Sequence, residues 1–153
     1  EWAPGVGLGI LPVLGVYFVQ TTAYTIPVAV AAIPSGILVH NLLFLNEFPD
    51  TEADRKAGRK TLPILLGKTK AGILYSALTI LVYLWIIGGV AAGKMPVFTL
   101  IALLTFPLAL KAIQGALKHQ EKSRLLSAMA SNVMIVLATQ LLLGVGYILA
   151  VVF

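Results

Sequence analysis

The residues best suited to chemistry are two aspartates four positions apart, Asp50 and Asp54, in the most polar part of the chain. On a helix this spacing places both carboxylates on one face, one turn apart. Like charges at that distance repel each other unless a cation lies between them. Magnesium prefers oxygen ligands and is usually held by one or two carboxylates, with water and substrate phosphates completing its shell. The pair therefore suggests a Mg²⁺ site for a phosphorylated substrate.

The same spacing also fits a solvated helix face whose aspartates are neutralised by neighbouring cations. Arg55, Lys56 and Arg59 follow closely in the chain, and such pairs are worth about a few tenths of a kcal/mol each. The spacing alone leaves both interpretations open.

Pro49 lies just before the pair, and its fixed φ suits the first position of a helix. We therefore expect a break at the membrane surface, followed by a short helix that presents both carboxylates.

Long apolar stretches surround this polar segment. The chain is 59% hydrophobic and only 11% charged, whereas soluble domains carry about 25% charged residues. We predict an all-α membrane protein with about five transmembrane helices, because too little charge is present to cover a water-facing surface and no alternating strands of barrel type occur. The expected spans are residues 3–19, 26–45, 71–92, 95–110 and 128–153.

The basic residues indicate an orientation. Ten of the eleven Lys and Arg residues fall between spans two and three or between spans four and five, and the remaining one is Lys94. With five crossings both basic loops lie on one side, which the positive-inside rule assigns to the cytoplasm. We expect a protein of the cell membrane with the motif loop 46–70 facing the cytoplasm, Glu1 inside and Phe153 outside. Basic loops of this kind do not indicate nucleic-acid binding, and the absence of cysteine excludes disulfides and thiolate metal sites.

The segment that begins at Asn46 reads N-x-x-x-D-x-x-x-D-R-x-x-G-x-x-T-L-P and resembles the second aspartate-rich motif of the UbiA superfamily of intramembrane prenyltransferases. A second likeness is Gly15-Val-Tyr17-Phe-Val-Gln20, which is similar to the G-x-Y-x-x-Q that ends a helix in menaquinone-type members. The likeness is good over about residues 5–75 and rests on hydropathy elsewhere. The motif falls on Asn46, Asp50, Asp54, Arg55, Gly58, Thr61 and Leu62.

The resemblance implies a magnesium-dependent transfer of a prenyl group from an allylic prenyl diphosphate to a lipophilic aromatic acceptor. The acceptor that it implies is a quinone precursor similar to dihydroxynaphthoate. It implies that Asp50 and Asp54 are catalytic and hold Mg²⁺, in a cavity bordered by membrane lipid. It also implies that Asn46 and Arg55 bind substrate, Asn46 through an amide oxygen or a metal-bound water and Arg55 through the diphosphate.

One feature departs from the resemblance. Family members fold as about nine membrane helices and use two aspartate motifs that face each other, but the first, N-D-x-x-D-x-x-x-D, does not occur in these 153 residues. We therefore expect the C-terminal half of a nine-helix prenyltransferase bundle. Its partner would be an N-terminal half that carries the first motif, and the fragment alone would be inactive.

Three other functions stay open. The aspartate motif ends in T-L-P-I, which is similar to the motif of archaeal enzymes that transfer a geranylgeranyl group to glyceryl phosphate for ether lipids. A CDP-alcohol phosphotransferase also uses D-x-x-x-D, but needs an upstream D-G-x-x-A-R and a glycine where Asn46 stands. A non-catalytic membrane transporter subunit is the third, although the five predicted spans contain no charged residue that would mark an ion pathway.

Overall fold

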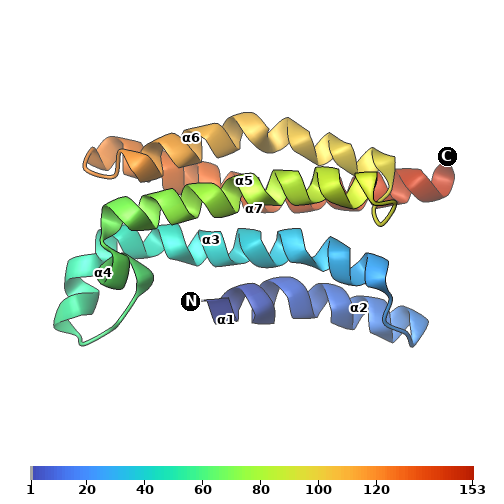
Figure 1. Ribbon diagram of the computed structural model, residues 1–153, viewed down its shortest axis with the longest axis horizontal. Coiled ribbons are helices and arrows are strands. Elements are labelled where there is room, and N and C mark those ends of the chain that lie inside the picture. The colour runs from blue at the N-terminus through green and yellow to red at the C-terminus, as the bar shows by residue number, and fades with distance from the viewer. Residues whose placement is uncertain (1) are drawn as a thin grey trace.

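The computed structural model describes residues 2–153, so Glu1 and its expected cytoplasmic position lie outside the described residues. The regular elements of this part are helices, and the long ones run lengthwise in one elongated bundle (Figure 1). They are α1 (Trp2–Pro4), the π-helical η1 (Gly5–Ile10), α2 (Leu11–Thr21), α3 (Ile26–Lys56), α4 (Leu62–Leu66), α5 (Lys68–Ala91), the 3-10 helix η2 (Val97–Thr105), α6 (Phe106–Leu117) and α7 (Lys122–Val152).

Five helical segments are long and apolar enough to cross a membrane, which confirms the predicted fold class. They are Trp2–Thr21, Ile26–Lys56, Lys68–Ala91, Val97–Leu117 and Lys122–Val152. The first runs from α1 through η1 into α2. The π-helical turn of this segment ends at Ile10, two residues before Pro12, which has no N–H to donate to the carbonyl four residues earlier.

Helix α3 differs from the prediction. The expected break at Pro49 is wrong, because α3 continues through Pro34 and Pro49 as a single helix to Lys56. Prolines are tolerated inside membrane helices where packing satisfies the freed carbonyl groups. A helix of 31 residues is about 46 Å long, whereas the hydrocarbon core of a bilayer is about 30 Å thick. Residues 46–56 are therefore a helical extension of the second span rather than part of a loop.

Two other spans also differ in their bounds. The span predicted at 95–110 begins as the 3-10 helix η2 and continues as α6 to Leu117. The last span begins at Lys122, so its first turn carries basic residues that the sequence had assigned to the loop.

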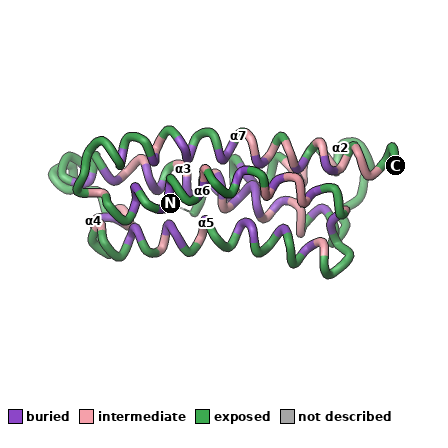
Figure 2. Tube along the Cα trace, turned by 90° about the horizontal axis from the view of Figure 1, so that it is seen from above, coloured by how far each residue is buried: buried purple, intermediate pink, exposed green. Residues whose placement is uncertain are grey.

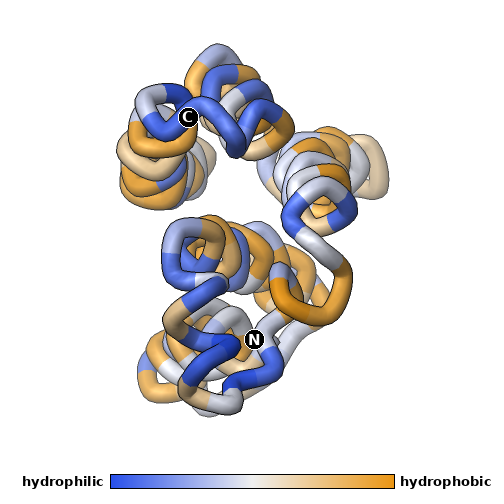
Figure 3. Tube along the Cα trace, turned by 90° about the vertical axis from the view of Figure 1, so that its left-hand side faces the viewer, coloured by the Kyte–Doolittle hydropathy of each residue, from blue (hydrophilic) through white to orange (hydrophobic). Residues whose placement is uncertain are grey.

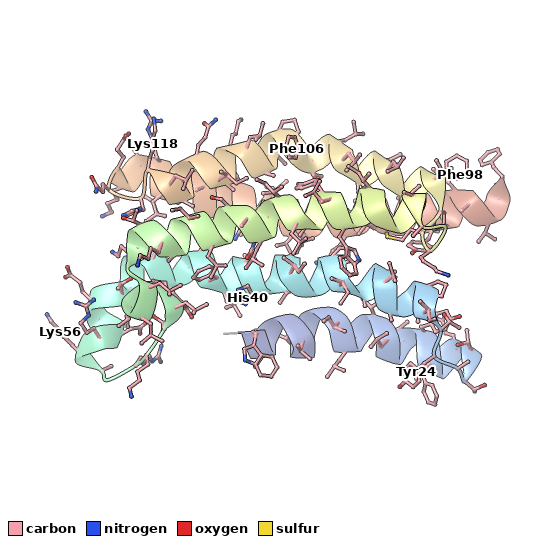
Figure 4. The ribbon with its side chains drawn as sticks, in the orientation of Figure 1. Tyr24, His40, Lys56, Phe98, Phe106 and Lys118 are labelled. Atoms are coloured by element: carbon pink, nitrogen blue, oxygen red, sulfur yellow. The ribbon has the colours of Figure 1, made fainter. Side chains whose placement is uncertain are left out.

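The two basic loops share one end of the bundle. Lys56 and Lys118 lie at that end, whereas Tyr24 and Phe98 lie at the other (Figure 4). Figure 3 views the bundle from the basic end and shows hydrophilic residues in the turns between the helices. The predicted clustering of basic residues on one side is thus present in the fold.

Buried residues lie where the helices face one another (Figure 2), and several of these contacts need glycine. A Cβ on Gly9 would lie 2.6 Å from Cα of Gly36, so η1 and α3 touch backbone to backbone. On Gly72 a Cβ would lie 2.8 Å from the carbonyl oxygen of Ala116, where α5 crosses α6. Small residues are the usual means of close helix packing in membranes, where no hydrophobic effect draws helices together.

A buried polar network fixes α3 to two neighbours. The Asn41 side-chain amide donates to the hydroxyl of Thr79 on α5 at 3.0 Å, and the Tyr75 hydroxyl donates to the Asn132 side-chain oxygen on α7 at 2.9 Å. Asn132 in turn donates to the main-chain carbonyl of Asn41 at 3.0 Å. Side-chain hydrogen bonds between membrane helices average about 0.6 kcal/mol each. This network thus helps to set the position of the helix that carries the aspartates.

Candidate functional site on the helical extension of α3

Asn46, Asp50 and Asp54 lie on the extension of α3 at intervals of four residues, so they follow one face of the helix. We call these three residues the carboxylate face. Asp50 is exposed, Asn46 is half-buried, and Asp54 is only 9% exposed. The face thus offers one carboxylate to solvent and shields the other.

The turn after α3 determines what Asp54 contacts. Gly58 has φ of +75°, the left-handed conformation that ends many helices. The Gly58 N–H donates to the carbonyl of Arg55 at 3.1 Å, and the Arg59 N–H donates to the carbonyl of Asp54 at 2.9 Å. This pair of bonds is a Schellman motif. It brings the chain back so that Arg59 lies beside Asp54.

The Arg59 guanidinium forms an ion pair with Asp54. Its Nη1 donates to Oδ1 of the carboxylate at 3.1 Å, and the Arg59 side chain is 69% exposed. Such a partly solvated pair contributes at most about 1 kcal/mol, so another cation can replace the guanidinium at low cost. Arg55, the arginine singled out in the sequence, is exposed and forms no ion pair within residues 2–153.

The extension is held against the loop between α6 and α7. Phe48 is fully buried, and its ring lies 6.1 Å from the His119 ring and 6.0 Å from the Phe44 ring. The Thr51 hydroxyl donates to the carbonyls of Glu47 and Phe48, at 3.0 and 2.9 Å, and stays buried. The carboxylate face therefore lies on a packed support, and no pattern in the sequence indicated the Phe48–His119 contact.

The carboxylate face has the donors that magnesium uses. Two carboxylates and one amide lie on one side of a helix, and the buried carboxylate is bound to a replaceable cation. No group of three or more His, Cys, Asp or Glu side chains gathers within residues 2–153. Magnesium commonly takes one or two protein carboxylates and fills the rest of its shell with water and phosphate oxygens. The residues present fit that incomplete protein shell.

An apolar pocket of 560 Å³ lies at the opposite end of the bundle, between α2, α3 and α7. Tyr17 and Gln20, the residues of the second sequence likeness, line it together with Pro27. About 23 residues of α3 separate Pro27 from Asp50, a distance of roughly 35 Å along the helix. The pocket suits hydrocarbon, but it lies too far from the carboxylate face to hold the same reacting atoms.

The chain matches the model of the UbiA prenyltransferase family over residues 1–137. It is 30% identical to a 1,4-dihydroxy-2-naphthoate octaprenyltransferase of Bacillus subtilis, over 98% of this chain and 48% of that protein. It is 29% identical to a protein of the same name from Haemophilus influenzae, over 92% of this chain and 46% of that protein.

A human relative, UbiA prenyltransferase domain-containing protein 1, is 31% identical over 94% of this chain and 40% of its own length. No solved structure matches the chain. The chain therefore spans about half the length of the curated relatives it matches. The family match over residues 1–137 agrees with the helical bundle and with the aspartate spacing on α3, and the chain belongs to the UbiA prenyltransferase family.

Proposed function

We propose that this chain supplies one aspartate-bearing half of a magnesium-dependent prenyltransferase. The reaction would transfer a prenyl group from an allylic prenyl diphosphate to an aromatic acceptor of the dihydroxynaphthoate type. The observation that carries the proposal is the carboxylate face at the polar end of an apolar helical bundle. The names of the Bacillus and Haemophilus relatives support the acceptor class. A complementary half with the first aspartate motif would complete the ligand shell.

Asp50 and Asp54 are the residues that would hold the metal. When bound there, Mg²⁺ neutralises the diphosphate and so favours its departure. Asp50 is exposed and so open to a ligand, while Asp54 is shielded and lies beside the turn at Gly58. The half-buried Asn46 can orient a ligand water through its amide. The apolar spans would exclude the water that otherwise captures a reactive allylic cation.

We propose a cytoplasmic position for the carboxylate face in the cell membrane. Ten of the eleven basic residues lie in or beside the two connections at this end of the bundle. Cytoplasmic loops carry such an excess of Lys and Arg. Water-soluble diphosphate and magnesium would then reach the site from the cytoplasm, whereas the prenyl tail would lie among the helices.

The deciding experiment measures binding of a prenyl diphosphate to the purified chain assembled with its complementary half, with Mg²⁺ and with EDTA. We expect binding to fall at least about tenfold in EDTA, because the carboxylates alone repel the ligand. Equal binding in EDTA would contradict the proposal and favour a transporter subunit.

A second experiment offers dihydroxynaphthoate, glyceryl phosphate and a CDP-alcohol to the same protein. The product that forms shows which of the three reactions the protein catalyses. The 153-residue chain alone is expected to give no transfer, and turnover by it would contradict the half-enzyme proposal.

Replacing Arg59 tests the ion pair at the site. Arg59→Gln is expected to tighten Mg²⁺ binding by about two- to fivefold in the absence of diphosphate, because the metal no longer competes with a guanidinium for Asp54. Titration calorimetry with Mg²⁺ measures the change. Lys60→Gln removes the same charge from the next residue, which forms no ion pair within residues 2–153. Equal tightening in both variants would show an effect of net charge rather than of the Arg59–Asp54 pair.

A further inference from the structure

We propose that a polar pocket between α6 and α7 binds the phosphate headgroup of an anionic phospholipid. The pocket has a volume of 280 Å³ and lies beside the basic loop between these helices, outside the carboxylate face. The residues that line it are Lys111, Gln114, Gly115, Arg124 and Ser127. The proposed prenyl transfer assigns no role to any of them.

The lining side chains suit a phosphate. Lys111 and Gln114 come from the middle of α6, and Arg124 and Ser127 come from the first two turns of α7. Lysine and arginine provide charged donors for phosphate oxygens, and the glutamine amide and the serine hydroxyl provide neutral donors. Basic pockets between membrane helices on the cytoplasmic side are a known way of holding anionic lipid headgroups.

The shape of the pocket is fixed by Gly115. A Cβ at this position would overlap the main-chain carbonyl of Arg124 and the Cβ of Ala128. The backbones of α6 and α7 therefore pack directly against each other at this level. The donors of the two helices are held at the sides of a rigid crossing rather than on a mobile loop.

The surroundings favour a lipid over a soluble anion. Leu110 and Leu117 on α6 and Leu126 on α7 are 43%, 48% and 54% exposed, on the same two helices as the pocket. Fatty acyl chains can cover such leucines while the phosphate lies among the cations beside them. A soluble phosphate would use the cations and leave the apolar neighbours uncovered, so the combination points to a phospholipid.

One acidic residue opposes anion binding. Glu121 precedes α7 and forms an ion pair with Arg124. A lipid phosphate must therefore share or displace the carboxylate partner of Arg124. The proposal thus predicts opposite effects for two neighbouring substitutions: loss of Arg124 weakens lipid binding, and neutralisation of Glu121 strengthens it.

The test is native mass spectrometry of the purified protein in detergent, titrated with phosphatidylglycerol or with phosphatidylcholine. We expect one phosphatidylglycerol to be retained more strongly than phosphatidylcholine. Lys111→Gln and Arg124→Gln should each weaken its binding by up to about fivefold, and Glu121→Gln should strengthen it. Ser127→Trp should block the pocket without a change of charge, whereas Ser127→Ala should have little effect.

The control is the double variant Lys56→Gln/Lys70→Gln, which removes two exposed cations of the same end that do not line the pocket. An equal loss in this control would overturn the proposal, because it would show only general attraction to the basic end. Displacement of the lipid by inorganic phosphate at a similar concentration would also overturn it, in favour of a soluble-anion site. Weaker binding in Glu121→Gln would contradict the assigned geometry.

Discussion

Asp54→Asn is expected to lower prenyl transfer by at least about a hundredfold while the protein stays folded. An amide carries no charge to hold Mg²⁺, and even the outer partners of metal ligands change affinity or activity by about 10- to 100-fold when replaced. The substitution keeps the volume of the side chain, and its amide oxygen can still accept from Arg59. The measurement is the initial rate of transfer by the complete enzyme over a range of Mg²⁺ concentrations.

The structure offers a close control for this variant. Glu52 is an exposed acid two residues before Asp54, so it points away from the carboxylate face. Glu52→Gln removes the same charge from the same helix and should keep most of the activity. Asp50→Asn should lose activity as Asp54→Asn does. Near-normal, magnesium-dependent transfer by either aspartate variant would refute the assignment of the metal site.

Gly9→Leu is expected to destabilise the fold more than any substitution on the carboxylate face. The new side chain would meet Cα of Gly36 and the carbonyl of Ser35, both of which are backbone atoms that cannot turn aside. Overpacking of this kind costs about 1–3 kcal/mol or more, and each kcal/mol lowers the unfolding midpoint of a chain of this size by about 2–4 °C. Thermal unfolding in detergent measures the shift.

Gly7 provides the matched control for this effect. It belongs to the same π-helical turn, but nothing lies within 4 Å of a Cβ built on it. Gly7→Leu therefore carries the same loss of glycine without the collision and should leave the midpoint nearly unchanged. If the two variants lower it equally, the loss of glycine from this π-helical turn, and not the contact with α3, is responsible.

The sequence predicted the features that depend on local composition. Long apolar runs define membrane helices because the bilayer sets their length, and the aspartate spacing places two carboxylates on one helix face wherever that helix lies. The predicted break at Pro49 was wrong. Whether a proline interrupts a membrane helix depends on whether neighbouring groups satisfy the carbonyl that it leaves without a partner, and the local sequence does not show those neighbours.

The ion-pair partner of Asp54 could be predicted from the sequence only in part. When a glycine just after a helix takes the left-handed conformation, the residue that follows it folds back against the third residue from the helix end. Gly58 is such a glycine, so Arg59 rather than Arg55 lies beside Asp54. The contact of Phe48 with His119 was not open to prediction. It joins segments far apart in the chain, and no spacing rule relates them.

The excess length of α3 has a consequence for how the protein responds to its membrane. Because the helix passes without interruption from the apolar region to Asp54, any change in its tilt within a bilayer would move both aspartates relative to the membrane surface. Bilayers of different thickness change the tilt of helices that exceed them. In the proposed prenyltransferase, the fatty-acid length of the host membrane would thus adjust how far a diphosphate must rise from the surface to meet the two aspartates.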